Sequence, residues 1–501
     1  MTFGRSHLLR ALAFSLFITP FLLHSAGAQT LDPKYLGHEF IRYDLNRISF
    51  AQPSLNRFFH RLHQLETGKV RRVNIVHIGD SHIQTDWWTS VMRTELQRKF
   101  GNAGRGLVFP FSIAKTNSPT DLAANSTSTW TNRRIIHSSN SMPAGLSGMV
   151  IRTQDPNFRL DLRMVRRESD YRFNKVTLLT GTGPEHVHIR IGNGLQSTPN
   201  SINGQRAPRP RPAARTTTAA AKYHDVQAGE TLYRIAKNNG LSIQELMDLN
   251  SLSGSTIRVG QRLKVSKGGT LTRSMPDYGP PCESELLLSS PRNRGYASTL
   301  YFEELSDRLV MQGVPCSPNQ RQTTLYGLVV ENYLKPGLLY HMIGVNGAKY
   351  AHYNRNDLFW HQFSLLDADL VVVSLGTNEL VMGQMPQSFP NDVETLVAKI
   401  REYAPYADIL LTTPNDNYSY SKRHNRGVEQ ASNYLKDYAQ SNGIACWDLY
   451  EIMGGANSIV NWRRAGLAQP DHLHFTHSGY VLQGHLLYQA LMNAYGFTRY
   501  P

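Results

Sequence analysis

Cysteine is scarce in this sequence, and its few positions have no metal-ligand spacing. The 501 residues include three cysteines, Cys282, Cys316 and Cys446. Structural metal sites need closely spaced cysteine or histidine ligands, so these positions predict none. In an oxidising compartment Cys282 and Cys316 can pair, but an unpaired set fits the sequence equally well. Cysteine chemistry is therefore not expected to carry the function.

The sequence also lacks a long hydrophobic run. Its apolar stretch from Ala11 to Leu23 is shorter than the ~20 residues of a membrane-spanning helix, and Pro20 interrupts it. Two arginines precede this stretch, and the small residues Ala26-Gly27-Ala28 follow it, as in a cleavable secretory signal. We therefore expect an exported protein, periplasmic, cell-wall associated or secreted, with no membrane span in the mature chain.

Acidic residues are outnumbered by basic ones, 38 against 53, which gives a net charge of +15. Such a balance can indicate nucleic-acid binding, but an exported protein meets cell-wall polymers and membrane surfaces instead. Much of the excess is local to the linker "GQRAPRPRPAARTTTAAAK". No nucleic-acid partner is expected.

Both ends of the chain alternate buried strands with amphipathic helices. An apolar strand at 73–78 precedes a helical pattern from Trp88 to Phe100, which Gly101 ends. The last third predicts strands at 370–375, 409–413 and 444–447 and helices at 391–403, 428–438 and 478–495. Asn391 and Glu394 predict a capping box. This alternation predicts a parallel sheet with helices on both faces.

Between these α/β portions the chain changes to short alternating runs such as "FRLDLRMV" and "TTLYGLVVE". Residues 111–195 and 281–335 therefore predict one antiparallel β domain built from two segments. Trp130 and several tyrosines of this domain are candidates to stack on sugar rings.

A compact module, residues 223–265, lies between two linkers within the β domain. A strand, two helices and a closing strand give it a βααβ pattern. Its motifs V-x-x-G-E-T-L, I-x-x-L-x-x-L-N and I-x-V-G-Q-x-L resemble the LysM domain over its whole length. The resemblance implies binding of N-acetylglucosamine-containing glycans, peptidoglycan among them, in a shallow groove.

The LysM resemblance assigns that groove to Gly229, Glu230, Thr231, Leu232, Asn250, Leu252, Ile257 and Val259. The four apolar residues are explained equally well as core. Gly229 and Thr231 also fit local roles, as turn and helix-start residues.

Four segments carry candidate catalytic groups. "VNIVHIGDSHIQTD" places Ser81 in a turn between a strand and a helix, where it can be a nucleophile and can also cap the helix. "LVVVSLGTNEL" ends a strand at Asn378, and "GLLYHMIGVNGAKY" ends another at Gly344 and Gly347. "QPDHLHFTHSGY" places a carboxylate and an imidazole, Asp471 and His474, three residues apart, so the first can orient the second.

These segments resemble the four blocks of the SGNH (GDSL) hydrolase family, over residues 29–110 and 336–501. The resemblance implies a flavodoxin-like, three-layer α/β fold, with Ser81 as nucleophile, His474 as general base and Asp471 as its orienting acid. It also implies an oxyanion hole of the Ser81 N–H, the Gly347 N–H and the Asn378 amide, with Gly344 as the weaker alternative.

Neighbouring histidines and acids in these segments add no cofactor. His472, His474 and His477 lack a further cysteine or acid to complete a metal site, so neither metal nor cofactor is expected. His82 and Asp86 extend the serine turn. They either line the pocket or support the turn by hydrogen bonds.

The inserted β domain, the export signal and the LysM motifs together resemble SGNH-type peptidoglycan O-acetylesterases. Those enzymes carry an inserted jelly-roll-like domain and remove acetyl groups from the 6-hydroxyl of N-acetylmuramic acid. The expected partner is peptidoglycan or another N-acetylglucosamine-containing glycan; protein partners are not indicated. A peptidoglycan O-acetyltransferase, an esterase of lipids or xylan-like polysaccharides, and a non-catalytic wall-binding protein stay open as alternatives.

The expected order along the chain is signal peptide (1–28), catalytic segment (29–110), β segment (111–195), linker (196–222), LysM domain (223–265), linker (266–280), β segment (281–335) and catalytic segment (336–501).

Overall fold

The computed structural model describes residues 37–498 except 138, 166–168, 193–221, 228–229, 240, 242, 253–256 and 267–295. The chain divides into two compact units, Met1–Gln196 with Ser284–Pro501, and Ser197–Glu283. The expected signal peptide, Cys282 and Gly229 lie outside the described residues. Cys316 is disulfide-bonded, and Cys446 is free and buried.

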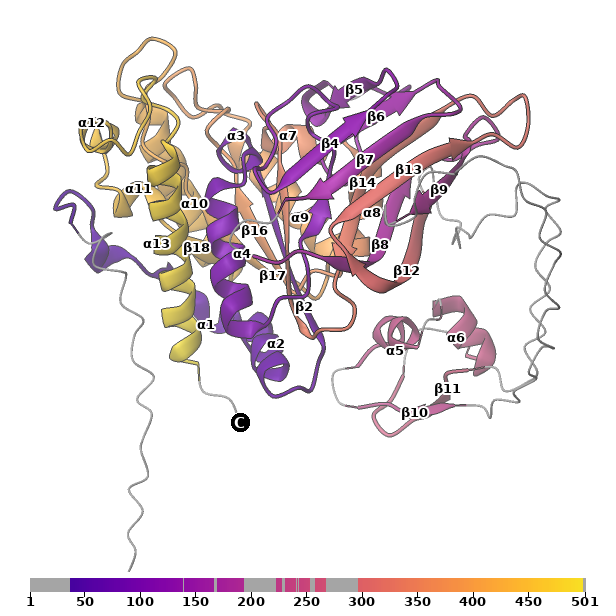
Figure 1. The fold of residues 1–501 in the computed structure, drawn as a ribbon. Coiled ribbons are helices and arrows are strands. Elements are labelled where there is room, and N and C mark those ends of the chain that lie inside the picture. The colour runs from indigo at the N-terminus through magenta and orange to yellow at the C-terminus, as the bar shows by residue number, and fades with distance from the viewer. Residues whose placement is uncertain are drawn as a thin grey trace, which may run out of the picture. The chain divides into compact units, whose positions relative to one another are not determined.

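A six-stranded sheet forms the centre of the first unit (Figure 1). Its order is β1 (Ile48–Ser49), β18 (Ala445–Trp447), β17 (Asp408–Thr412), β16 (Leu370–Ser374), β2 (Arg72–Gly79) and β15 (Gly337–Gly344). All neighbours pair in parallel except β1, which is antiparallel to β18. The continuous apolar runs of the sequence fit this position, because a parallel sheet is covered on both faces.

The parallel strands have the flavodoxin-like order. Numbered along the chain from β2, they lie in the order 2-1-3-4-5 across the sheet. The chain therefore reverses its direction across the sheet between β2 and β16, and ligands of open α/β folds bind in the crevice beyond the carboxyl ends of such strands. The predicted SGNH-hydrolase fold class is confirmed.

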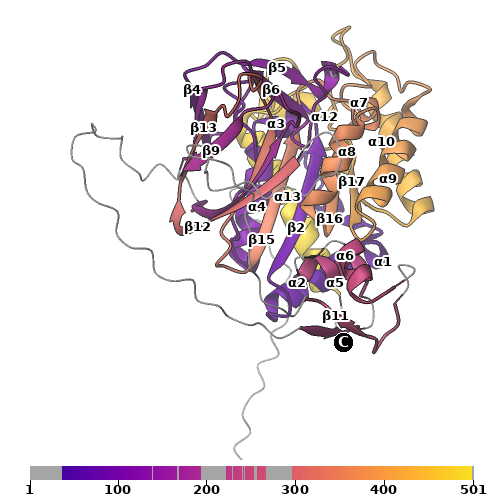
Figure 2. The ribbon, with the colours of Figure 1, turned by 90° about the vertical axis from the view of Figure 1, so that its right-hand side faces the viewer.

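Helices cover both faces of this sheet (Figures 1 and 2). On one face α4 (Trp87–Phe100) packs along α13 (His477–Gly496), and on the other α7 (Tyr350–Asn354) and α8 (Asp357–Phe363) pack on α9 (Phe389–Tyr403). The remaining α-helices of this part are α1 (Ala51–Ser54), α2 (Asn56–Glu66), α3 (Ser81–Gln84), α10 (Arg426–Asn442), α11 (Leu449–Ile452) and α12 (Ser458–Arg464).

The predicted helices are present, but the capping box is wrong. Helix α9 begins at Phe389, with Ser388 at the N-cap and Pro390 in its first turn. Asn391 therefore lies inside the first turn and cannot cap the helix. Proline fixes a helical φ at a position where the missing N–H costs nothing, so it determines the start.

Two antiparallel sheets make up the β domain. One has the order β12 (Tyr296–Ser306), β8 (Phe173–Thr180), β14 (Thr323–Glu331), β6 (Met149–Thr153), β5 (Thr131–Arg134), with β3 (Gly106–Val108) also paired to β14. The other has the order β4 (Leu122–Ser126), β7 (Arg159–Met164), β13 (Arg308–Val314), β9 (His188–Gly192). Both sequence segments therefore contribute to each sheet, as predicted.

Trp130 is not available to a sugar ring. Its side chain is 6% exposed, packs edge-on against Phe158 and donates its indole N–H to Ser126 Oγ at 2.8 Å. The expectation that Trp130 stacks on glycan is wrong, because the indole belongs to the core of the β domain.

Strands β2 and β15 are neighbours although more than 250 residues separate them. They pair from Arg72↔Gly337 to Gly79↔Gly344 without a register shift. Strand β14, which immediately precedes β15, pairs with β3, which follows α4. The insertion thus leaves and re-enters the catalytic sheet at adjacent points, so the first catalytic segment folds against the last.

The second unit has the predicted βααβ pattern. Strands β10 (Tyr223–Asp225) and β11 (Arg262–Lys264) pair antiparallel, and α5 (Leu232–Asn238) and α6 (Ile243–Leu249) lie between them in sequence. Val226, Leu232, Ile235, Leu246 and Leu263 are buried in a core of its own.

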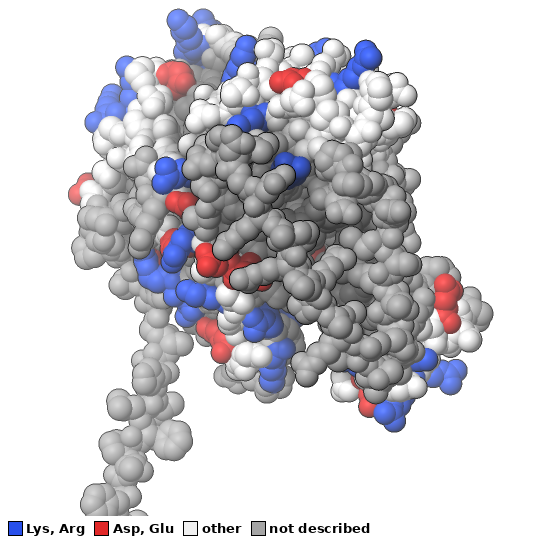
Figure 3. Space-filling view, turned by 45° about the vertical axis from the view of Figure 1, so that its right-hand side comes forward, with Lys and Arg blue, Asp and Glu red and all other residues white. Residues whose placement is uncertain are grey.

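The basic excess does not gather into one patch on the face shown in Figure 3. Lys and Arg side chains are interspersed with Asp and Glu over the described part of that face. Within the described residues, no helix has the length and apolarity to cross a membrane.

Candidate active site

Ser81 lies at the carboxyl end of β2, as the first residue of α3. The turn that leads to it is tight: a Cβ at Gly79 would lie 2.8 Å from the carbonyl oxygen of Ser374 on β16. Asp80 is the N-cap of α3, because its Oδ1 accepts the N–H of His82 at 3.0 Å. The prediction that Ser81 also caps the helix is therefore wrong. Its hydroxyl is left to face another partner.

That partner is His474, in the loop before α13. Ser81 Oγ lies 3.1 Å from His474 Nε2, and His474 Nδ1 lies 2.8 Å from Asp471 Oδ2. The other oxygen of Asp471 accepts the N–H groups of Leu473 and His474, each at 3.0 Å. The carboxylate thus fixes both the imidazole and the loop that carries it. The three sequence-predicted residues come together in the order hydroxyl, imidazole, carboxylate.

Asp471 is ionised at neutral pH. Partial burial raises its pKa, but the hydrogen bonds from the His474 ring and from the two backbone N–H groups outweigh this and lower the pKa to about 2. Its side chain is 48% exposed. A charged Asp471 can accept the Nδ1 proton of His474, which leaves Nε2 to accept the proton of Ser81.

The sequence predicts the backbone N–H groups of Ser81 and Gly347 as oxyanion donors. Among the described residues, neither N–H group donates a hydrogen bond. Gly347 has a φ of +81°, which favours glycine. Gly344 has a packing role instead, since a Cβ there would lie 2.6 Å from the backbone nitrogen of Gln84 on α3.

Asn378, after β16, binds the serine turn directly. Its Nδ2 donates to Asp80 Oδ2 at 3.1 Å and to the carbonyl oxygen of Ala348 at 3.0 Å. Both amide hydrogens are thus used within the protein. Asn378 joins the turn that holds Ser81 to the loop that holds Gly347.

Two buried acids beside these groups were missed from the sequence, Asp80 as a cap and Glu379 altogether. Burial raises the pKa of Asp80 to about 6, although the N–H of His82 and the charge of His474 act in the opposite direction. Burial also raises the pKa of Glu379 to about 8. Glu379 Oε1 accepts the N–H of Tyr350 at 2.7 Å, and its Oε2 is buried with no partner among the described residues. The position of Glu379 directly after Asn378 is the sequence feature that could have indicated its place near the site.

His82 packs against the ring of His474. Its ring stacks on that of His474, with centroids 5.1 Å apart, and its Nδ1 lies 2.9 Å from the Tyr480 hydroxyl. Burial and the neighbouring His474 lower the pKa of His82 to about 3, so the ring is neutral. Of the two sequence interpretations, the structure favours support of the turn.

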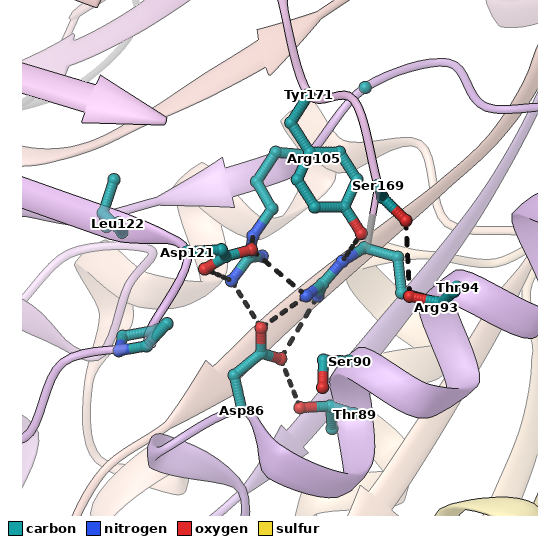
Figure 4. A network of polar contacts seen from close by, with 12 residues as sticks. Asp86, Thr89, Ser90, Arg93, Thr94, Arg105, Asp121, Leu122, Ser169 and Tyr171 are labelled. Carbon is teal, nitrogen blue, oxygen red and sulfur yellow. Dashed lines mark hydrogen bonds and ion pairs between the residues drawn. The ribbon is translucent and has the colours of Figure 1, made fainter. Parts of the chain in front are cut away.

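Asp86 lies in a buried ionic network (Figure 4). It pairs with Arg93 of α4 and, at 2.6 Å, with Arg105, which in turn pairs with Asp121 at 2.6 Å. Arg93 also donates to the Tyr171 hydroxyl at 3.0 Å. Burial raises the pKa of Asp86, but the two arginines outweigh this and lower it. Asp86 therefore joins the catalytic helix α4 to the start of the β domain and does not line the pocket.

The comparisons with known proteins agree with this geometry. Residues 310–482 match the model of the GDSL-like lipase/acylhydrolase family, and residues 224–266 match that of the LysM domain. This protein combines a GDSL-like hydrolase domain with a LysM domain. The GDSL-like domain and the fold support an ester hydrolase. The family match contains Gly347, Asn378, Asp471 and His474. Ser81 precedes the match and is separated from it by the insertion. The fold nevertheless brings Ser81 beside His474.

A solved structure of a peptidoglycan O-acetylesterase has the same fold as this protein. It superposes with a TM-score of 0.57 at 16% identity, over 88% of this chain and 96% of the other. The match covers the β domain as well as the catalytic sheet, because neither alone is as long.

Curated relatives match this chain in part. An autolysin of Enterococcus faecalis (strain ATCC 700802 / V583) is 45% identical over 53 residues, 11% of this chain and 7% of the autolysin. The N-acetylmuramoyl-L-alanine amidase sle1 of Staphylococcus aureus (strain bovine RF122 / ET3-1) is 23% identical over 211 residues, 41% of this chain and 53% of the amidase. The chain spans about half the amidase and a small part of the autolysin.

The predicted groove residues of the LysM domain divide into two sets. Leu232 is 2% exposed, and Leu252 and Ile257 pack against the core of the domain. Asn250 is used internally, because its amide donates to two carbonyl groups, of Leu246 and Lys264, and its Oδ1 accepts the Lys264 N–H. Val259 is 69% exposed.

The polar members of the predicted groove make local contacts. Glu230 Oε2 accepts the N–H of Gln227 at 2.8 Å and lies 2.6 Å from His224 Nε2, while Thr231 Oγ1 accepts the N–H of Arg234 at 3.3 Å. Thr231 thus takes the helix-start role. Binding of glycan by these residues stays a prediction.

The histidines near the catalytic loop go to different partners. His472 stacks on Tyr418 and lies 3.1 Å from Arg463 Nη1, His474 faces Ser81, and the His477 ring meets Trp87 edge-on. Within the described part of the chain, no group of three or more His, Cys, Asp or Glu residues is placed to hold a metal ion.

Proposed function

We propose that this protein is an exported serine esterase that removes O-acetyl groups from peptidoglycan, at the 6-hydroxyl of N-acetylmuramic acid. The observation that carries the proposal is the chain of contacts from Ser81 Oγ through the His474 ring to Asp471, at 3.1 and 2.8 Å. The LysM domain, the fold shared with a peptidoglycan O-acetylesterase and the partial match to an N-acetylmuramoyl-L-alanine amidase support the choice of substrate.

In the proposed reaction, His474 accepts the hydroxyl proton while Ser81 Oγ attacks the acetyl carbonyl carbon. The tetrahedral intermediate collapses, His474 donates the proton to the sugar oxygen, and the deacetylated glycan leaves. Water then attacks the acetyl-serine with His474 as base, and His474 returns this proton to Ser81 Oγ as acetate leaves. Asp471 stabilises the imidazolium at both steps.

The oxyanion of the intermediate would be held by the free N–H groups of Ser81 and Gly347. Asn378 can join them only by exchanging its bond to Asp80 or Ala348 for one to the substrate, because both Nδ2 hydrogens are engaged. Loss of one such donor typically raises the barrier by ~3–4 kcal/mol.

The LysM domain would hold the enzyme on its polymeric substrate. A tethered domain raises the effective concentration of its partner without new contacts at the active site. The second unit has its own core, so it can act as an independent binding module. Export and cell-wall association are parts of this proposal.

The test is acetate release from O-acetylated peptidoglycan by the full protein beside Ser81→Ala. Release by the wild type, abolished in the variant, is the expected result. A fluorophosphonate probe should label Ser81 in the wild type and nothing in Ser81→Ala. Absence of labelling would indicate a non-catalytic wall-binding protein.

The same assay separates hydrolysis from transfer. Labelled wild type that releases no acetate contradicts the proposed hydrolysis. Chitooligosaccharide acceptors are then added with a small acetyl donor, and acetylated sugar would show that a sugar hydroxyl replaces water at the acetyl-serine.

A further inference from the structure

A cleft of about 510 Å³ lies between the β domain and the catalytic helices of the first unit. One wall is the 3₁₀-helix η3 (Ile135–His137) and the chain that follows it, and the other is formed by α7 and α8. Its lining includes Ile136, Ser139, Asn140, His352, Arg355 and His361. A volume of this size suits a ligand of one or two sugar or amino-acid units.

The walls of the cleft are fixed to one another. The N–H of Leu146, in the β domain, donates to Gln362 Oε1 of α8 at 2.8 Å, and both groups are buried. The start of α7 is held by the bond from the Tyr350 N–H to Glu379. The cleft is therefore a built feature of the junction between the two domains.

The cleft borders the predicted oxyanion loop. A Cβ built on Gly347 would lie 3.6 Å from Cδ1 of Ile136, so this lining residue lies beside the loop that carries Gly347. A substrate with its acetyl group at Ser81 can therefore extend from the oxyanion loop past Ile136 into the cleft.

The cleft lining carries one arginine, Arg355, and one acid, Asp357. Arg355 is exposed, and within the described residues no carboxylate lies within 4.0 Å of its guanidinium. Burial lowers the pKa of His352, and the nearby charges of Lys349, Arg355 and His137 lower it further, so the His352 ring is neutral at neutral pH. Asp357 is the acid of the lining, but its side chain is 83% exposed and lies 3.9 Å from Lys399 Nζ.

We propose that this cleft binds a carboxylate of the peptide substituent on the glycan, with Arg355 as its principal contact. The inference rests on the proposed function and extends it. Arg355 offers a planar pair of donors that matches a carboxylate. The enzyme would then select acetylated sugars that carry an acidic peptide over bare acetylated glycan.

The experiment measures kcat and KM of Arg355→Ala on three substrates: p-nitrophenyl acetate, soluble O-acetylated peptidoglycan fragments with free stem-peptide carboxylates, and the same fragments after amidation. We expect KM for the free-carboxylate fragments to rise about tenfold, with unchanged kcat. The two substrates without a free carboxylate should be unaffected, and Arg355→Lys, which keeps the charge but not the paired donors, should restore only part of the loss.

The matched control is Arg47→Ala. Arg47 is an exposed arginine next to β1, at the opposite edge of the sheet from β15, and should change none of the three values. Equal KM values for wild type and Arg355→Ala on free-carboxylate fragments would overturn the proposal, as would an equal loss on amidated fragments.

Failure of the proposed function gives a different result. If the wild type cleaves p-nitrophenyl acetate but no peptidoglycan fragment, the cleft is tested by calorimetric binding of the fragments to Ser81→Ala, with and without Arg355→Ala. A weaker Kd in the double variant supports the cleft; an equal Kd, or no binding to either, rejects it.

Discussion

At the scale of single residues, Asp471 is the group whose removal tests the order of the catalytic contacts. Asp471→Asn keeps the shape of the side chain but replaces an ionised acceptor of the His474 Nδ1 proton with a neutral amide. The imidazole is then no longer held in the tautomer that accepts from Ser81. We expect kcat on p-nitrophenyl acetate to fall by about 10³-fold or more.

The control for this substitution is His472→Ala. His472 is next to Asp471, but its ring stacks on Tyr418 and has no contact with Ser81. Its removal should leave kcat within about threefold. An Asp471→Asn enzyme that keeps more than a tenth of the wild-type kcat would contradict the assigned role.

The buried carboxyl group of Glu379 should make the stability of the protein depend on pH. Burial raises its pKa from 4.5 to about 8, so between these values the folded state binds a proton that the unfolded state has released. The free energy of unfolding contributed by this group is therefore full below about pH 4.5 and is lost as pH rises to about 8. Glu379→Gln mimics the protonated acid at every pH.

We expect the variant to gain stability relative to wild type as pH rises from about 5 to 8, by on the order of 2–4 kcal/mol. Chemical denaturation at a series of pH values measures the difference. A difference that does not change with pH would show that Glu379 is charged in the folded protein.

At the scale of elements, the network around Asp86 joins α4 to the β domain (Figure 4). Asp86→Ala leaves Arg93 and Arg105 without their shared carboxylate in a site where both are essentially unexposed. Breaking one partner of a buried pair typically costs about 3–5 kcal/mol. We expect a loss of that size in the free energy of unfolding, measured by chemical denaturation.

Arg98→Ala provides the comparison on the same helix. Arg98 pairs with Glu95 at 2.5 Å, but its side chain is 65% exposed, and pairs of this kind contribute less than about 1 kcal/mol. If Asp86→Ala and Arg98→Ala cost the same, the buried network does not hold the two elements together.

The elements also show which parts of the site the sequence could predict. Ser81, Asn378 and Gly347 each follow an apolar run that reads as a parallel strand, and the carboxyl ends of such strands meet at one edge. Periodicity therefore predicted their meeting. It could not predict the Asp80 cap, because Asp80 competes with Ser81 for that role and Asn378, 298 residues away, supplies its second partner.

The Glu379 contact depends on how α7 meets the loop after β16, and the burial of Trp130 on packing within the β domain. The cleft depends on how the β domain packs on α7 and α8. No local pattern encodes that packing. The two-residue strand β1 was missed for a simpler reason, since two residues are too few to show a period of two.

At the scale of the whole molecule, we expect the chain to separate catalysis from attachment to the wall. The hydrolase and β domains share one continuous core, whereas the second unit has a core of its own. Replacing residues 223–265 by a Gly/Ser linker of equal length should therefore leave kcat and KM on p-nitrophenyl acetate unchanged. It should lower the fraction of protein that sediments with insoluble peptidoglycan, and slow acetate release from it several-fold.

The effect should depend on substrate size, because tethering acts only where one polymer offers sites for both units. Soluble disaccharide fragments should be deacetylated at the same rate with and without the LysM domain. Equal loss on soluble fragments and insoluble wall would mean that the LysM domain contributes to the active site itself. No loss on either substrate would mean that the first unit alone is sufficient to hold the glycan.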